Sequence, residues 1–421
     1  MTYRPRVLVV YGTRPEAVKV APVVLALRQD PDLQALVVDT GQHPDLTAAV
    51  HETFGTHPDC TLSIARPGQS VGAIAARTMT AVGSLLAEWR PDLVLVHGDT
   101  TAAAATALAA HYAHLPVAHL EAGLRSGDLW SPWPEEANRS VIGRLAGLHL
   151  APTATARDNL LHEGVPAERV VVTGNTVVDA LLHTLDRARP NLPGPLEERA
   201  AAARQVVLFT AHRRESWGGG LARVAAGLAD VLADRPDTLL LAPLHPNPVV
   251  RDAVLPELAR VASAVVTDPF DHPAFCRAMQ LSTVIVTDSG GVQEEAPSLG
   301  VPVLVTRDTT ERPEAVAAGA NRLVGTERAA VASALREVLD DPGARARMAA
   351  VENPYGDGHA GRRVVRAIRE FLGVPPRHRR RDDDVLHDDV RRHEDVLHDD
   401  VRDADARHDD ALGATAAVGV A

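Results

Sequence analysis

The stretch Val7-Leu-Val-Val-Tyr-Gly-Thr-Arg-Pro-Glu-Ala-Val-Lys19 joins a short apolar run to a polar turn and then to a helical pattern. Apolar runs of this kind return at 35–40, 93–96, 117–120 and 148–151, with amphipathic stretches between them. Strands that alternate with helices in this way predict βαβ units and a parallel sheet.

The same rhythm starts again in the second half, with apolar runs at 206–209, 239–242, 264–267, 284–287 and 302–305. A Pro- and Ala-rich stretch at 187–203 precedes it and is typical of helix and exposed connection. A chain of 421 residues is long enough for two cores. We therefore predict an α/β protein with two doubly wound domains, 1–175 and 176–359, and a cleft between them. A last helix, 360–374, is expected to pack back on the first domain.

The segment 375–421 has a different character. Asp384–Arg391 recurs as Asp395–Arg402, among acidic and basic residues with few large apolar ones. Such a segment buries too little apolar surface to offset its ordering entropy, so we predict a disordered tail. We favour a solvated tail over a loose metal site built from its His and Asp residues.

The composition excludes several classes of protein. A net charge of -12 argues against a nucleic-acid-binding surface. Cys60 and Cys276 stand far apart and outside any CxxC spacing, so neither a disulfide framework nor a thiolate zinc site is expected. The N-terminus lacks the pattern of a signal peptide, and no apolar run is suited to spanning a bilayer. These features predict a cytoplasmic protein with no membrane contact and no metal.

Ligands of open α/β sheets bind beyond the carboxyl ends of the strands, and unusual residues gather there. Ser289-Gly290-Gly291 lies between a predicted strand and a helical stretch that begins near Gln293, and its backbone amides could hold an anion, with Glu295 reaching a ribose. Turns of this composition are also common with no ligand at all. Three cations would flank a diphosphate in this cleft: Arg14, Lys19 and Arg312. Lys19 is the only lysine of the chain, which indicates a position that needs a compact ammonium rather than a guanidinium.

Neither a GxGxxG turn after the first strand nor a GxxxxGK[ST] loop is present, so redox chemistry through a bound nicotinamide and P-loop chemistry are disfavoured. Proton transfer remains, and Asp99, Glu121 and Glu135 all lie at or beyond predicted strand ends. A set of carboxylates on one wall can act as acid and base on opposite faces of a sugar. Each of them could equally be a helix cap or a surface ion pair.

Taken together, the motifs resemble those of the non-hydrolysing UDP-N-acetylglucosamine 2-epimerases. The resemblance runs in order from residue 7 to about 372. The matching stretches are Gly12-Thr-Arg-Pro-Glu-Ala-Val-Lys19, Val96-His-Gly-Asp-Thr-Thr101, Leu120-Glu-Ala-Gly-Leu-Arg125, Ser131-Pro-Trp-Pro-Glu-Glu-Ala-Asn-Arg139, His212-Arg-Arg-Glu-Ser216, Asp288-Ser-Gly-Gly291, Gln293-Glu-Glu-Ala-Pro-Ser-Leu-Gly300 and Arg307-Asp-Thr-Thr-Glu-Arg-Pro-Glu-Ala315.

The resemblance implies a GT-B-like fold of two Rossmann-type domains, a homodimer and no cofactor. It implies reversible conversion of UDP-N-acetylglucosamine to UDP-N-acetylmannosamine, which supplies surface polysaccharides. UDP would be eliminated to give 2-acetamidoglucal and then added back. Two site groups follow by motif match: an acid/base and leaving-group set of Asp99, Glu121, Glu135, His212 and Arg139, and a nucleotide set of Arg14, Lys19, Phe275, Ser289, Gly290, Gly291, Glu295 and Arg312.

The resemblance also implies a second UDP-N-acetylglucosamine bound as an activator by Gln42, His43, Arg213 and His245. Pro44 departs from the longer polar or basic side chain usual at that position. Three alternatives stay open. A hydrolysing epimerase would release N-acetylmannosamine and UDP, a GT-B glycosyltransferase would need an acceptor, and a catalytically dead sensor would lack the acids.

Overall fold

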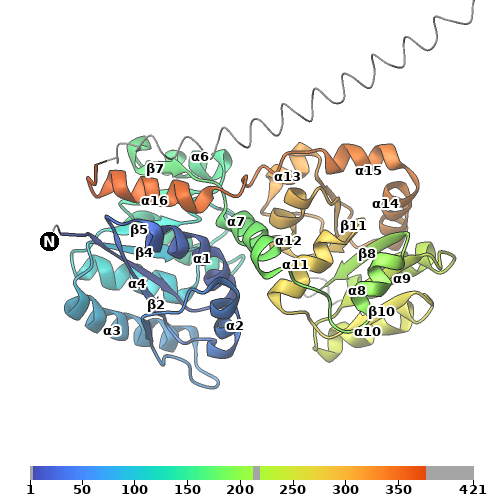
Figure 1. Ribbon diagram of the computed structural model, residues 1–421, viewed down its shortest axis with the longest axis horizontal. Helices are drawn as coiled ribbons and strands as arrows, with labels where there is room; N and C mark the ends of the chain where they lie inside the picture. Colours follow the sequence, from blue (N-terminus) through green and yellow to red (C-terminus); the bar gives the residue numbers. More distant parts are fainter. Residues whose placement is uncertain (1–2, 212–218, 376–421) are drawn as a thin grey trace, which may run out of the picture. The chain divides into compact units, whose positions relative to one another are not determined.

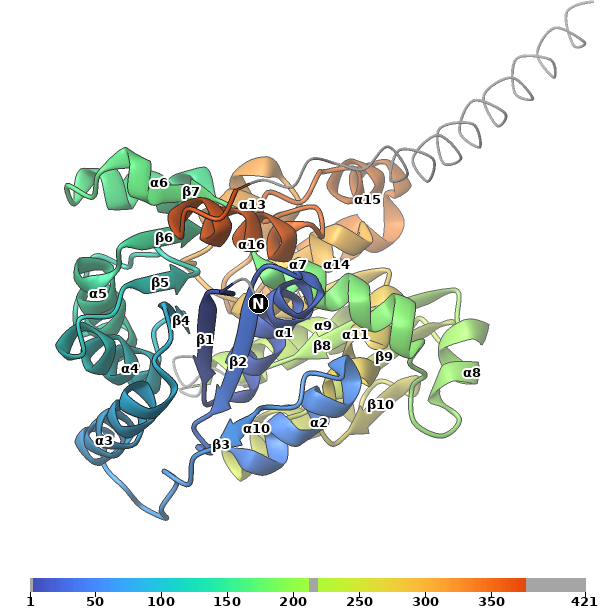
Figure 2. The same ribbon diagram turned by 60° about the vertical axis from the view of Figure 1, so that its left-hand side comes forward.

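The computed structural model describes residues 3–211 and 219–375. Residues Met1–Gly373 form one compact unit that contains two separate parallel sheets. Figures 1 and 2 show these sheets with their helices. The predicted fold class is therefore confirmed. His212, Arg213 and the charged repeat lie outside the described residues.

The first sheet has seven strands within the described part of the chain, in the order β3-β2-β1-β4-β5-β6-β7. They are β1 (Arg6–Tyr11), β2 (Gln34–Asp39), β3 (Cys60–Thr61), β4 (Leu93–His97), β5 (Val117–Leu120), β6 (Leu148–Ala151) and β7 (Val170–Val172). β1 pairs with β2 on one side and with β4 on the other, both in parallel. The strand order therefore changes direction between β1 and β4, which is where sheets of this type bind ligands.

The helices of this half connect the strands. They are α1 (Arg14–Gln29), α2 (Pro44–Phe54), α3 (Val71–Trp89), α4 (Thr101–Tyr112), α5 (Glu135–Leu145) and α6 (Ala154–His162). One apolar core joins α3, α4 and α5 to β1 and β4, through side chains such as Leu8 and Ile142. α1 begins with a capping box, in which Thr13 accepts from the Glu16 amide and Glu16 accepts from the Thr13 amide. This fixes the turn after β1.

The second sheet repeats the plan in the order β10-β9-β8-β11-β12-β13. Its strands are β8 (Gln205–Thr210), β9 (Thr238–Pro243), β10 (Ala264–Thr267), β11 (Val284–Thr287), β12 (Val303–Val305) and β13 (Asn321–Leu323). Its helices are α8 (Leu196–Ala202), α9 (Gly220–Leu232), α10 (Pro248–Leu258), α11 (His272–Gln280), α12 (Gly290–Glu295), α13 (Pro313–Ala318), α14 (Arg328–Asp340) and α15 (Pro342–Ala349). Here the direction changes between β8 and β11.

Two helices link the halves of the unit. α7 (Thr176–His183) carries the chain from the first sheet toward the second, and α16 (Ala360–Phe371) returns to lie beside α1 (Figure 2). Asp179 in α7 accepts hydrogen bonds from the Ala360 and Gly361 amides at the start of α16. Near the other end of α16, Arg369 pairs with Asp30 at 2.8 Å.

The ten predicted strands all occur, with ends that differ by at most one residue. Three short strands, β3, β7 and β13, were not predicted. The helix after Ser289 begins at Gly290, whereas the sequence placed its start near Gln293. The two glycines therefore lie inside the first turn of the helix and not in a loop before it.

Candidate functional site

A cavity of about 490 Å³ lies beyond the carboxyl end of β1 in the first sheet and the carboxyl ends of β8, β9, β10 and β11 in the second. α1 contributes one wall, and the second half of the chain contributes the other. Its lining residues are Arg14, Pro15, Val18, Lys19, Val177, Thr210, Ala211, Pro243, His245, Pro269, Phe270, His272, Phe275, Ser289, Gly291, Val292, Glu295 and Arg312. Three cations and several apolar side chains thus face one space, a composition suited to a charged ligand with an aromatic part.

Lys19 joins the two walls through ion pairs. Its Nζ lies 2.7 Å from Glu121 Oε2 and 3.2 Å from Glu294 Oε2. Arg312 Nε in turn lies 2.8 Å from the other oxygen of Glu294. Burial opposes the charge on Lys19, but Glu121 and Glu294 outweigh it and hold the pKa of the ammonium above its usual range. Both cations are thus charged and held in place at the cavity wall.

Glu121 is held by two basic side chains, Lys19 and His97. It follows β5 with a φ of 64°, and its Oε2 lies 2.8 Å from His97 Nε2 as well as near Lys19. Burial alone would raise the pKa of Glu121, but Lys19 and His97 together hold it well below its usual range. Glu121 is therefore an ionised, largely buried base next to the cavity.

Asp99 follows β4 and is held by α5. Arg139 Nε donates to Asp99 Oδ2 at 3.1 Å, and Asn138 Nδ2 donates to the Asp99 carbonyl at 2.9 Å. Arg139 also pairs with Glu136 at 2.8 Å, and Glu136 is only 2% exposed. Glu135, at the first position of α5, is half-buried, and its carboxylate makes no hydrogen bond or ion pair with another described residue. Of the two neighbouring glutamates, Glu136 anchors Arg139, whereas Glu135 is free to meet a ligand.

Glu16 ties the turn after β1 to the turn after β4. Its Oε2 accepts from the Gly12 and Thr13 amides at 3.1 and 2.8 Å. Its Oε1 accepts from Thr100 Oγ1 at 2.7 Å, and Thr100 follows Asp99 directly. Glu16 therefore joins the two loops on either side of the direction change in the first sheet.

The wall from the second sheet surrounds the first turn of α12. A Cβ on Gly290 would lie 2.5 Å from the Arg312 guanidinium, so only glycine allows this arginine to pack over the turn. Glu295 is 8% exposed, and burial, with the neighbouring Glu294, raises its pKa to about 8. Burial, together with Arg14, lowers the pKa of His272 to about 4. Near neutral pH, His272 is therefore uncharged, and Glu295 is largely protonated.

The cavity collects most of the candidates from the nucleotide set. Arg14, Lys19, Phe275, Ser289, Gly291, Glu295 and Arg312 line it, and Gly290 lies beneath Arg312. Asp99, Glu121, Glu135 and Arg139 are not among its described lining residues, although Glu121 is linked to it through Lys19. His245 lines it as well. Gln42 and His43 adjoin each other after β2, with their Nε2 atoms 3.5 Å apart.

Sequence reasoning missed four groups that organise the site: Glu16, His97, Glu136 and Glu294. Glu16, His97 and Glu136 lie within motifs quoted above, directly beside or close to selected residues, and Glu294 directly precedes the selected Glu295. Some of their partners are distant in sequence, as for Glu294 and Lys19, 275 residues apart, whereas Glu136 pairs with Arg139 only three positions on. Position within a motif was the one available signal.

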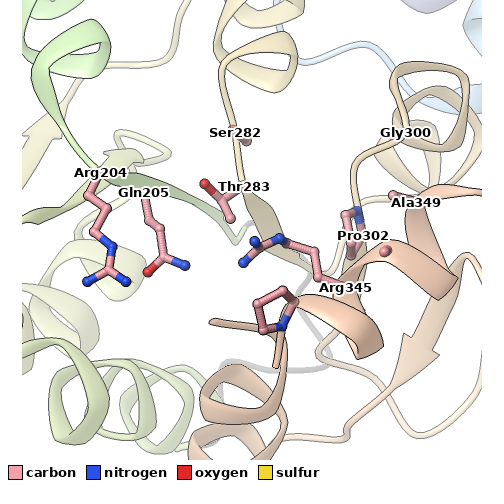
Figure 3. A pocket seen from close by; sticks show the side chains of 10 residues that line it. Arg204, Gln205, Ser282, Thr283, Gly300, Pro302, Arg345 and Ala349 are labelled. Carbon is pink, nitrogen blue, oxygen red and sulfur yellow. The ribbon is translucent and has the colours of Figure 1, made fainter. Parts of the chain in front are cut away.

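A second cavity, of about 410 Å³, lies at the amino ends of the strands of the second sheet (Figure 3). It adjoins the amino ends of β8 and β11 at Gln205 and Thr283, with Arg204 and Arg345 at its rim. No acidic side chain is among its described lining residues. Ligands of such sheets bind at the carboxyl ends of the strands, so we place the candidate site in the first cavity.

Other kinds of site find no support in the described part of the chain. Residues 3–211 and 219–375 contain no cluster of three or more His, Cys, Asp or Glu side chains arranged for a metal ion. Cys60 and Cys276 are both free thiols. None of the helices in these same ranges is long and apolar enough to cross a membrane.

Two parallel α/β sheets with a cation-lined cavity at their carboxyl ends define a two-domain enzyme of the GT-B-like class. The chain belongs to the UDP-N-acetylglucosamine 2-epimerase family, because the family model of that description matches residues 25–369. It is 46% identical over 371 residues to the UDP-N-acetylglucosamine 2-epimerase of Salmonella typhimurium, covering 87% of this chain and 99% of that protein.

The Escherichia coli K12 enzyme of the same name is also 46% identical over 371 residues, covering 86% of this chain and 98% of its own. Among solved structures, the UDP-GlcNAc 2-epimerase of Neisseria meningitidis bound to UDP-GlcNAc superposes with a TM-score of 0.79 at 41% identity. That comparison covers 87% of this chain and 100% of the neisserial one. The predicted family is confirmed.

Proposed function

We propose that the protein interconverts UDP-N-acetylglucosamine and UDP-N-acetylmannosamine by eliminating and re-adding UDP through 2-acetamidoglucal. Membership of the family and the ligand of the neisserial relative support the substrate. The observation that carries the mechanism is the pairing of an ionised, buried Glu121 with Lys19 at the wall of a cavity that also holds Arg14 and Arg312. This places a base beside cations suited to a leaving diphosphate.

Two groups of residues would divide the work. Phe275, Ser289, Gly290, Gly291 and Glu295 would bind the nucleoside and its first phosphate. Three cations, Arg14, Lys19 and Arg312, would bind the diphosphate from both walls. Lys19 and Arg312 both pair with Glu294, which holds the two cations in place at the cavity wall.

The chemistry would proceed through charge at C1. When the C1–O bond breaks, its electron pair leaves with UDP, and the positive charge that develops at C1 acidifies the C2 hydrogen. A carboxylate takes that proton, and the C2–H electrons form the C1=C2 bond. Re-addition after the proton returns to the other face of C2 gives the epimer. Asp99, Glu121 and Glu135 form the acid/base set, while Arg139 and His212 support the leaving group.

This route needs no nicotinamide. The complete Ser131–Arg139 and Arg307–Ala315 stretches favour the non-hydrolysing branch over the hydrolysing one. A glycosyltransferase would keep the nucleotide wall but would not require three carboxylates opposite it. We further propose that the enzyme is a cytoplasmic homodimer that serves surface polysaccharide synthesis.

The test is proton NMR of the purified protein with UDP-N-acetylglucosamine in deuterated water, without nicotinamide. We expect UDP-N-acetylmannosamine that carries deuterium at C2. Glu121→Gln should lower the rate at least about 100-fold, because it removes an ionised acid/base group. Release of UDP with free N-acetylmannosamine would instead indicate the hydrolysing reaction, and an unchanged spectrum would favour a glycosyltransferase.

We also propose that UDP-N-acetylglucosamine activates the enzyme at a second site containing Gln42, His43, Arg213 and His245. The reverse reaction should then show a lag or a sigmoidal rate curve that added UDP-N-acetylglucosamine removes. A hyperbolic curve without that addition would count against activation and would point to the effect of Pro44 on this loop.

A further inference from the structure

His119 is a buried histidine outside the residues assigned above. It lies in β5, its exposure is 0%, and its Nε2 is 2.7 Å from the carbonyl oxygen of Gly98. Its Nδ1 is buried and has no hydrogen-bond partner within the described residues. Burial lowers the pKa of His119 to about 3, so the ring is neutral. Because a carbonyl can only accept, the single ring proton is on Nε2.

The acceptor of that bond is the turn that presents Asp99. Gly98 directly follows β4 and has a φ of 64°, a conformation that favours glycine. Its amide donates to the Leu120 carbonyl at 2.9 Å, while its carbonyl accepts from His119. Two consecutive residues of β5 therefore fix both polar groups of the residue before Asp99.

We propose that His119 is a positioning residue that sets the direction of the Asp99 carboxylate through the Gly98 carbonyl. This inference rests on the proposed function, in which Asp99 belongs to the acid/base set. Arg139 and Asn138 hold Asp99 from the side of α5, and His119 holds the backbone that leads into it. Proton transfer depends steeply on geometry, so a small rotation of this turn should lower turnover without weakening nucleotide binding.

His149 provides a matched control. It lies on the adjacent strand β6, paired in register with His119. It is 1% exposed, and burial lowers its pKa to about 4. It matches His119 in burial and charge, but no hydrogen bond joins it to the described residues of the turn before Asp99.

The experiment compares His119→Met, His119→Gln, His119→Asn and His149→Met in the full chain, with kcat and KM for UDP-N-acetylglucosamine measured alongside UDP affinity. His119→Met should lower kcat about 10- to 100-fold, and KM and UDP affinity should stay within about twofold of the wild type. His119→Gln should recover most of kcat, because its amide nitrogen has nearly the reach of Nε2. His119→Asn, whose amide is too short, should not. His149→Met should keep kcat within about threefold.

Equal kcat for His119→Met and the wild type would overturn the inference, as would failure of Gln to restore activity or an equal loss in His149→Met. If His119→Met does not fold, the comparison of Gln with Asn decides alone. Asp99→Asn separates this inference from the proposed function. An active Asp99→Asn would overturn the role of His119 together with the place of Asp99 in the acid/base set. A wild type without epimerase activity would overturn the proposed function itself. An inactive Asp99→Asn beside fully active His119 variants would overturn only the role of His119.

Discussion

At the scale of single residues, Glu295 is a carboxyl group whose ionisation is unfavourable in the folded protein. It lies on the cavity wall with Glu294 as its neighbour, and burial raises its pKa from 4.5 to about 8. A proton on Glu295 is therefore favoured in the folded chain. We interpret this as a site that accepts ionisation only when hydroxyl donors of a ligand approach, which would suit the ribose role proposed for it.

This pKa predicts how stability depends on pH. Since the folded-state value is the higher one, the contribution of protonated Glu295 is complete below about pH 4.5 and is lost as pH rises through about 8. Relative to the wild type, Glu295→Gln should therefore gain about 2–3 kcal/mol of unfolding free energy between pH 6 and pH 9. Urea unfolding of both proteins at the two pH values measures this gain.

The exposed Glu88 supplies the control, because Glu88→Gln should show no such change. Parallel pH profiles for the wild type and Glu295→Gln would contradict the raised pKa.

The sequence could identify the charged residues of the site but not all of their partners. Arg14, Lys19 and Arg312 were selected because they follow strands or lie in motifs, and all three line the cavity. Glu294 was missed although it pairs with two of them. Its neighbour Glu295 has the same chemistry, and only the packing of α1 and α12, each against α7, decides which of the two reaches Lys19.

At the scale of elements, long strands were predictable because continuous apolar runs bounded by turns signal burial on both faces. β3, β7 and β13 have only two or three residues each and lie at the ends of their sheets, where they are partly exposed, whereas the equally short β12 lies inside its sheet and is buried throughout. β3, β7 and β13 form because each one pairs with the backbone of the neighbouring strand, β2, β6 or β12. The start of α12 was also not predictable from local sequence, because Gly290 and Gly291 have low helix propensity. The helix begins there because Arg312 packs over its first turn.

The contact between α16 and α1 predicts an effect for one glycine. A Cβ on Gly361 would lie 2.9 Å from the backbone oxygen of Pro22, so Gly361→Ala must push the two helices apart. We expect a loss of about 1–3 kcal/mol in unfolding free energy. Gly83 in α3 has no atom within 4 Å of an added Cβ, and Gly83→Ala should stabilise by about 0.5–1 kcal/mol.

Thermal or urea unfolding of both variants gives the comparison. Equal effects of the two substitutions would mean that helix propensity, and not the α1 contact, governs position 361.

At the scale of the whole molecule, polar side chains join the two halves. Lys19 in α1 lies 3.2 Å from Glu294 in α12, and Thr153 Oγ1 donates to Glu314 of α13 at 2.7 Å. The sequence could predict two sheets but not these pairs, because the two residues of each pair are far apart in the chain and no local pattern links them. Both contacts are polar, as is common between domains that move relative to each other.

The proposed reaction predicts that such movement accompanies ligand binding. A neutral glycal freed from its diphosphate would diffuse away from an open site, so the halves should close while UDP and glycal are both present. A diphosphate bridging Lys19 and Arg14 on one wall to Arg312 on the other supplies the attraction. We expect UDP-N-acetylglucosamine to reduce the radius of gyration in solution scattering, and uridine, which lacks the diphosphate, to leave it unchanged. Identical scattering profiles with and without UDP-N-acetylglucosamine would mean that binding contacts alone retain the glycal. An equal effect of uridine would mean that the nucleoside, and not the diphosphate, causes closure.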